Sequence, residues 1–404
     1  MNITDNLEEI VRLEVMDAID LSIDVSDEDI HRLIRDTIIK KGREISISLE
    51  ERKQIETHVF NSLRKLDVLE DLLSDEEITE IMINGPDNIF IEKNGKVFKS
   101  KERFSSEEKL NDIIQSIVAN SNKIVNESNP IVDSRLPDGS RINIVLKPAA
   151  VDYSIVSIRK FPKEQMTMER LKGFNAIEDE QIEFLRKLVI SGYNIFVSGG
   201  TGSGKTSFLN ALGEFIPQDE RVITIEDSAE LQLKNVSNLV RLEARNANLE
   251  GKNEITIRDL LKSSLRMRPD RIIVGECRGA EALEMLQAFN TGHDGSASTG
   301  HSNSCKDMLS RLETMVLMGA EIPLAAIRQQ IASGIDIIVQ LGRLRDKSRK
   351  LLEICEVLGI NEGEIELNPL YRFKEIKEVN GRIEGIWEKV GELQNKEKLI
   401  RHGL

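Results

Sequence analysis

A run of glycines followed by a lysine and a threonine has the spacing of a phosphate-binding loop. From Gly199 to Thr206 the sequence reads Gly-Gly-Thr-Gly-Ser-Gly-Lys-Thr, which fits G-x-x-x-x-G-K-[ST]. Glycine adopts the left-handed backbone that turns successive N–H groups toward a polyphosphate, and the helix that follows adds the positive end of its dipole. In this interpretation Lys205 reaches the β- and γ-phosphates, and the Thr206 hydroxyl binds Mg²⁺ directly. The expected nucleotide contacts are Gly200, Thr201, Gly202, Ser203, Gly204, Lys205, Thr206 and Ser207.

The alternative is a glycine-rich turn at an ordinary junction between a strand and a helix. Such a turn has no use for Lys205 and Thr206 at its end, and it does not demand four glycines. An apolar strand over residues 194–198 precedes the loop, and this is the context that favours the phosphate-binding interpretation.

Carboxylates follow two further short apolar runs, residues 222–225 and 271–274. Glu226 and Glu276 are expected to hold Mg²⁺ through water, because this ion dehydrates reluctantly, and Glu230 to contribute to the nucleotide site. Glu276 is the candidate that polarises the attacking water, although glycine stands before it where an Asp-Glu pair is common. The alternatives are ordinary strand-end acids for 226–230 and a helix N-terminal carboxylate for Glu276.

Two of the five histidines, His293 and His301, lie in one loop rich in glycine and serine, residues 291–301. The pair alone is compatible with metal ligation. The strand-end partners of a zinc site are missing, so hydrogen-bonding roles that sense phosphate or relay between subunits are favoured.

Three arginines precede the phosphate loop: Arg135, Arg141 and Arg159. They are either surface residues or arginines that reach the γ-phosphate. The second role accelerates phosphoryl transfer by about 10³- to 10⁵-fold in known cases, so a domain that closes over the loop could supply it.

The 404 residues exceed one ordinary core and predict two or three domains. Residues 1–66 have apolar positions at helical spacing and predict a helical module, whose acids form a solvated face or a docking surface for a partner. Those acids include Asp24, Asp27, Glu28 and Asp29. Residues 67–163 predict a mixed α+β domain, with a hairpin over 89–98 that turns at Asn94-Gly95 and a Pro-Asp-Gly turn between strands at 137–139.

Residues 164–404 alternate short apolar runs with helical patterns, which is typical of an α/β fold whose mostly parallel sheet is covered on both faces. In such sheets the ligand binds beyond the carboxyl ends of the strands, where the carboxylates described above are placed.

The composition is that of a globular protein, with 40% hydrophobic and 31% charged residues. No apolar run approaches the roughly 20 residues that span a bilayer, and the acidic start lacks a signal-peptide pattern, so a cytoplasmic protein is expected. A net charge of −14 argues against broad binding to nucleic acid. The cysteines Cys277, Cys305 and Cys355 form no C-x-x-C pair, so reduced thiols are expected rather than a structural zinc site or a disulfide framework.

The order of these motifs resembles the type II and type IV secretion ATPase superfamily. Its Walker A, Asp box, Walker B and His box are similar to residues 199–206, 225–230, 265–278 and 291–301. Residues 133–143, 158–161 and 325–346 resemble more narrowly the CpaF branch, which serves Tad/Flp pilus assembly. The sequence departs from the superfamily pattern on either side of His301, at Gly300 and Ser302, and it lacks the tetracysteine zinc element of some relatives.

The resemblance implies a PAS-like α+β domain joined to a RecA-like P-loop ATPase domain. It also implies a homohexameric ring at the cytoplasmic face of the inner membrane that hydrolyses ATP with Mg²⁺. ATP would lie between the two domains, with Arg141 and Arg159, and also Arg135, as arginine contacts and Glu276 as the catalytic carboxylate. His293 and His301 would match the His box. An inner-membrane platform protein of a pilus or secretion system would be the partner, with no nucleic acid. A nucleic-acid translocase and a non-catalytic nucleotide-gated scaffold are the rival interpretations.

Overall fold

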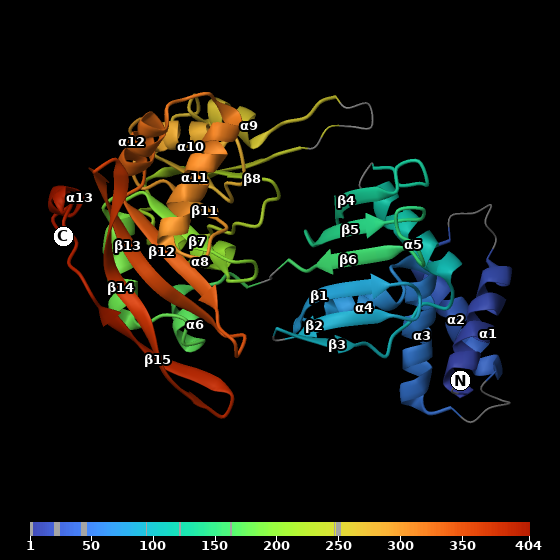
Figure 1. The fold of residues 1–404 in the computed structure, drawn as a ribbon. Coiled ribbons are helices and arrows are strands. Elements are labelled where there is room, and N and C mark those ends of the chain that lie inside the picture. Colours follow the sequence, from blue (N-terminus) through green and yellow to red (C-terminus); the bar gives the residue numbers. More distant parts are fainter. Residues whose placement is uncertain are drawn as a thin grey trace. The chain divides into compact units, whose positions relative to one another are not determined.

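The computed structural model describes residues 3–19, 25–41, 47–93, 95–120, 123–161, 164–245, 247 and 252–404. The chain divides into two compact units, Met1–Lys163 and Glu164–Leu404 (Figure 1). Among the described residues, no helix combines the length and the apolar character needed to cross a bilayer.

Three helices open the first unit: α1 (Ile3–Ala18), α2 (Asp27–Lys41) and α3 (Leu49–Arg64). Their apolar faces form one shared core because the apolar residues recur at helical spacing. Ser48 and Glu51 form a capping box at the start of α3. The acids Asp27, Glu28 and Asp29 occupy the first turn of α2, where negative charge stabilises the helix dipole. Asp24 lies outside the described residues.

A six-stranded antiparallel sheet completes the first unit, in the order β3-β2-β1-β6-β5-β4. Two helices, α4 (Val68–Ser74) and α5 (Glu107–Asn120), share its core. The predicted hairpin is confirmed, with Lys93 opposite Lys96 and a positive φ of 72° at Gly95, while Asn94 lies outside the described residues. The strands are β1 (Ile78–Asn84), β2 (Ile89–Lys93), β3 (Lys96–Lys99), β4 (Ile131–Arg135), β5 (Arg141–Val145) and β6 (Ile155–Arg159).

The second unit contains a nine-stranded sheet in the order β15-β14-β13-β12-β7-β11-β10-β8-β9. The six strands from β12 to β9 are parallel, as the sequence predicts. They are β7 (Ile195–Gly199), β8 (Arg221–Glu226), β9 (Asn238–Glu243), β10 (Arg271–Val274), β11 (Ala297–Gly300) and β12 (Ile337–Arg343).

Helices cover both faces of this sheet, and the burial of the phosphate-loop strand shows it directly. Ile195 and Val197 belong to a core with α6 (Met168–Gly173), α7 (Asp179–Ile190), α8 (Lys205–Leu212) and the 3-10 turn η1 (Gly213–Phe215). Phe196 points to the other face, where it joins a core with α9 (Ile257–Ser264), α10 (Ala282–Phe289), α11 (Cys305–Gly319) and α12 (Leu324–Gly334). A strand buried on both faces is the expected element of a parallel sheet, and the fold is RecA-like.

An antiparallel extension that the sequence analysis did not predict continues the sheet beyond β12. It consists of β13 (Arg349–Asn361), β14 (Glu364–Val379) and β15 (Arg382–Lys389), and the short helix α13 (Glu397–Arg401) follows (Figure 1).

Candidate functional site

Four adjacent parallel strands, β7, β11, β10 and β8, carry the candidate residues at their carboxyl ends. The phosphate loop follows β7, His301 follows β11, Glu276 comes two residues after β10, and Glu226 is the last residue of β8. The parallel register therefore brings these four segments to one edge of the sheet, where open α/β sheets bind ligands.

Glycine is required at three positions of the loop for steric reasons. Gly202 and Gly204 have positive φ angles of 70° and 94°, which disfavour any side chain. At Gly199 a Cβ atom would lie 2.5 Å from Ser203 Oγ and 2.7 Å from the carbonyl oxygen of Leu341. Gly204 then caps α8 in the left-handed conformation, so the loop leads directly into the helix N-terminus.

The Lys205 ammonium is held inside the loop. Its Nζ donates to the carbonyl oxygens of Gly199 at 3.1 Å and Gly200 at 3.2 Å, and it lies 3.2 Å from His301 Nδ1. Because an ammonium group only donates, His301 Nδ1 must accept, and the neutral ring therefore carries its proton on Nε2. Burial, together with the charge of Lys205, lowers the pKa of His301, which favours this neutral form.

His301 joins the lysine to the predicted catalytic carboxylate. Its Nε2 lies 2.8 Å from Glu276 Oε1, so one imidazole lies between the Lys205 ammonium and the Glu276 carboxylate. The other oxygen of Glu276 accepts a 2.6 Å hydrogen bond from Arg278, whose second terminal nitrogen lies 3.4 Å from Asp227. Arg278 therefore positions one carboxylate oxygen, whereas Oε1 lies against the imidazole and has no hydrogen-bond partner in the described part of the chain.

Glu226 is the most enclosed acid at this edge, with an exposed fraction of 3%. One oxygen, Oε2, accepts from the backbone N–H groups of Glu230 and Leu231 at 2.8 and 3.0 Å. Burial raises the pKa of Glu226 to about 7. Among the described residues, no hydrogen-bond donor reaches Oε1.

The residues present fit a magnesium nucleotide. The orphaned oxygen of Glu226 is a buried acceptor with no protein partner in the described part of the chain, as a water ligand of Mg²⁺ would require. Thr206 is the second residue of α8, directly after the lysine. A cation at this edge would stabilise the ionised form of the buried Glu226 carboxylate.

The structure does not bring His293 to this edge. His293 precedes β11 and His301 follows it, so the two histidines lie at opposite ends of one short strand. His293 Nδ1 lies 2.9 Å from the carbonyl oxygen of Ala288, and its backbone oxygen accepts from Ser296, whose own N–H bonds to Asn194 at the start of β7. His293 is thus a residue of the amino-terminal edge of the sheet. Its geometry gives no support to the prediction that it binds the nucleotide.

The three candidate arginines lie in register across three strands of the first unit. Arg135 on β4 pairs with Arg141 on β5, and Arg141 pairs with Arg159 on β6. Directly opposed residues of antiparallel strands project to the same face, so these residues form one arginine row.

Sequence reasoning missed two arginines of the site. Arg278 could have been found from its position two residues after Glu276. Arg349, whose Nε donates to the Gly202 carbonyl at 2.9 Å, comes from the unpredicted strand β13, and no local signal in the sequence identifies it.

Comparison with known proteins agrees with this architecture. The type II/IV secretion system protein family matches residues 62–397. A putative conjugal transfer protein of Mycobacterium tuberculosis is 33% identical over 324 residues, which cover 77% of this chain and 91% of the relative. The type IV secretion system protein VirB11 of Brucella suis is 33% identical over 303 residues, which cover 68% and 84%.

Two solved structures share the fold. The pilus retraction motor PilT with bound ADP aligns with a TM-score of 0.54 and 19% identity, covering 84% of this chain and 86% of that one. The Legionella pneumophila ATPase DotB aligns with a TM-score of 0.51 and 22% identity, covering 73% and 80%. Because the family match covers most of the chain and the relatives cover more than two thirds of it, this protein belongs to the type II/IV secretion system protein family.

Proposed function

We propose that this chain hydrolyses ATP with Mg²⁺ and uses the energy to drive a secretion or pilus machine. The observation that carries the proposal is the chain of contacts from Lys205 through His301 to Glu276, with distances of 3.2 and 2.8 Å, at the edge where the phosphate loop opens. In this proposal the cation that would bind phosphate and the carboxylate that would orient water lie on either side of one neutral imidazole.

Each residue has a defined task in this proposal. The loop N–H groups and the N-terminus of α8 bind the phosphates, and Lys205 exchanges its carbonyl partners for the β- and γ-phosphate oxygens. Thr206 would hold Mg²⁺ directly, and Glu226 and Glu276 through water; the ion would neutralise charge developing on the phosphate oxygens. Glu276, positioned by Arg278 and lying beside His301, orients and polarises the attacking water.

The finer identity of the machine is also a proposal. We propose a homohexamer at the cytoplasmic face of the inner membrane, bound to a platform protein. The residues at 133–143, 158–161 and 325–346 favour Tad/Flp pilus assembly within the family. The arginine row supplies the arginine contact to the nucleotide, from the same subunit or from a neighbour.

A phosphate-release assay on Glu276→Gln tests the chemistry. The variant is expected to bind ATP with near wild-type affinity and to lose hydrolysis, because glutamine keeps the shape but cannot accept a proton from water. Lys205→Ala is expected to lose both binding and turnover. Glu321→Gln, which changes an exposed glutamate in the loop before α12, is the matched control and should remain active. Near wild-type turnover by Glu276→Gln would show that another group activates water.

A second candidate follows from the names of the relatives. One is named a putative conjugal transfer protein, and another, from Rhizobium radiobacter, is named conjugal transfer protein TrbB. The two candidates are separated by measuring ATP hydrolysis in three conditions: protein alone, protein with liposomes or the platform protein, and protein with DNA. Strong, salt-sensitive stimulation by DNA would favour a role in conjugal transfer, against the expectation from the net charge of −14.

A further inference from the structure

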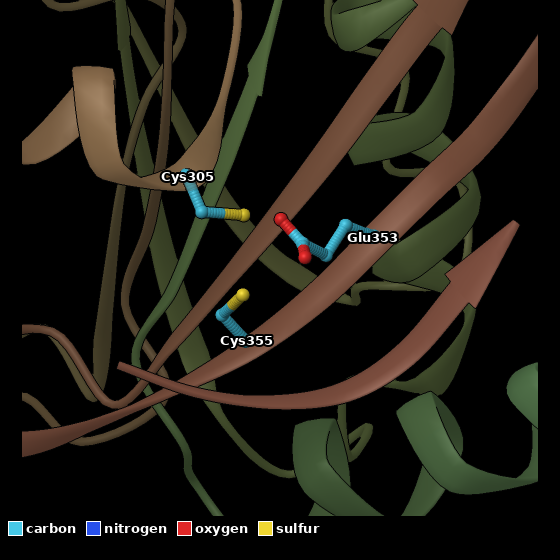
Figure 2. Close-up of side chains that lie close together, drawn as sticks. All are labelled: Cys305, Glu353 and Cys355. Carbon is cyan, nitrogen blue, oxygen red and sulfur yellow. The ribbon is translucent and has the colours of Figure 1, made fainter. Parts of the chain in front are cut away.

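Two cysteines that are 50 positions apart in the sequence, Cys305 and Cys355, lie close together beside Glu353. In the sheet, β12 separates β13, which carries Glu353 and Cys355, from the phosphate-loop strand β7. Cys305 is the first residue of α11, and Glu353 and Cys355 lie on β13. Figure 2 shows the two sulfur atoms and the carboxylate pointing toward one another. The donor atoms all lie within 4.8 Å of one another. The fold thus brings together two cysteines whose sequence spacing does not indicate a shared site.

The geometry is close to that of a metal site. Tetrahedral Zn²⁺ binds thiolates at about 2.3 Å, which sets neighbouring donors about 3.8 Å apart, so a small contraction of this cluster would suffice. Both cysteines are 1% exposed, whereas the Glu353 side chain is 19% exposed. We propose that Cys305, Cys355 and Glu353 bind Zn²⁺, with water as the fourth ligand.

The surroundings of Glu353 support this assignment. Arg372, directly opposite on β14, donates from Nε at 3.1 Å and from a terminal nitrogen at 2.7 Å to the same oxygen, Glu353 Oε1. One arginine thus occupies one carboxylate oxygen and leaves the other to the sulfur atoms. A ligating carboxylate that is oriented by an outer partner is the usual arrangement around a bound metal.

A divalent cation would balance the charge of this cluster, because it stabilises both thiolates and displaces their protons to solvent.

The proposed zinc would fix the segment that follows His301. Cys305 comes four residues after His301. Between them, the backbone carbonyl oxygen of Ser302 accepts a hydrogen bond from the side-chain amide of Gln340 on β12. An ion that joins Cys305 to β13 would therefore anchor the end of the His301 loop. This site is separate from the magnesium nucleotide, and its existence does not depend on the proposed ATPase reaction.

Metal uptake by the full-length protein tests the proposal. Reduced, chelator-treated protein is titrated with Zn²⁺, and bound zinc is measured by atomic emission after gel filtration. The wild-type protein is expected to retain one zinc per chain, and Co²⁺ should produce a thiolate-to-cobalt charge-transfer band. Cys305→Ser and Cys355→Ser should abolish retention and the band, and Arg372→Gln should weaken binding by about 10- to 100-fold.

Cys277→Ser is the matched control, because Cys277 is equally buried but its sulfur lies 3.8 Å from Met315 Sδ, outside the cluster. It should retain zinc. Zn²⁺ should raise the melting temperature of the wild type and of this control, but not that of Cys305→Ser or Cys355→Ser. Absence of zinc and cobalt uptake by wild-type protein would overturn the proposal without reference to any variant. So would uptake that persists in both cysteine variants. A thiol count of one in denatured, unreduced protein, with peptide mapping that joins Cys305 to Cys355, would also overturn it, because a disulfide leaves no thiolates to bind zinc.

Discussion

A Cβ atom on Gly275 would lie 2.7 Å from Cγ of Glu226, so the glycine before Glu276 makes room for the acid on the neighbouring strand. The two residues follow paired positions of β10 and β8, where Val274 lies opposite Ile225. This close approach explains why the common Asp-Glu pair is absent here. A side chain at position 275 would occupy the volume that the buried Glu226 fills.

Substitution of Gly275 should therefore destabilise the second unit. Gly275→Ala is expected to cost about 1 to 3 kcal/mol, the usual range for overpacking a filled site, as measured by the midpoint of urea unfolding. Gly173→Ala, in α6, is the control, because a Cβ atom there meets nothing within 4 Å.

A double-mutant cycle attributes that cost to Glu226. In a Glu226→Ala background the Cγ atom is gone, so Gly275→Ala should cost less than in the wild type. Strictly additive effects would mean that the destabilisation has another source.

His301 should affect turnover more than nucleotide binding, because its neutral ring accepts from Lys205 and faces Glu276 with a proton on Nε2. His301→Ala is expected to lower kcat on the order of 10²-fold, as for loss of one positioned polar contact, with little change in ATP affinity. His301→Gln should recover part of the rate, since an amide offers one acceptor and one donor. Equal losses in the alanine and glutamine variants would contradict the bridging role.

The phosphate loop could be predicted from sequence because its requirements are local. Glycine spacing, the lysine-threonine pair and the apolar run before them are all contained in residues 195–206. The strand-end acids Glu226 and Glu276 could also be predicted, since buried parallel strands read as continuous apolar runs. Their convergence then follows from the parallel topology.

The predicted loop from 291 to 301 shows where such reasoning fails. The strand between the two histidines, β11, reads Ala-Ser-Thr-Gly and carries none of the large β-branched apolar residues that mark a strand. Sequence analysis therefore placed both histidines in one loop, whereas a buried strand separates them. The pairing of Cys305 with Cys355 was missed for a related reason, because it depends on tertiary packing of α11 against β13.

The first unit should show a pH dependence that comes from His58. This histidine on α3 lies 3.1 Å from Glu8 on α1 and 3.6 Å from Asp71 on α4. Its hydrogen bond with Glu8 raises the pKa of His58 above 6.5, so the folded state binds the proton more tightly than the unfolded state. The resulting stabilisation is complete below pH 6.5 and disappears as the pH rises through the folded pKa.

His58→Gln should remove that component of stability. The expected result is a lower urea midpoint for the variant at about pH 5.5, and a difference from wild type that shrinks toward about pH 8.5. His402→Gln, near the chain end, is the control and should show no such convergence. A difference that is constant with pH would assign His58 a packing role only.

The arginine row makes the last prediction. Arg135, Arg141 and Arg159 face the same side of their sheet at directly opposed positions, which concentrates positive charge that the core of this unit does not require. If the row contacts the γ-phosphate, Arg141→Ala or Arg159→Ala should lower kcat on the order of 10³-fold or more while ATP binding to the phosphate loop persists. Arg32→Ala, on α2 of the same unit, should leave hydrolysis unchanged. Mixing an arginine variant with Lys205→Ala protein then separates two arrangements of the proposed oligomer, because a mixed assembly regains activity only if one subunit's arginines act on the nucleotide of its neighbour. Full activity of both single variants and of the Arg141→Ala, Arg159→Ala double variant would show that the row has no part in catalysis.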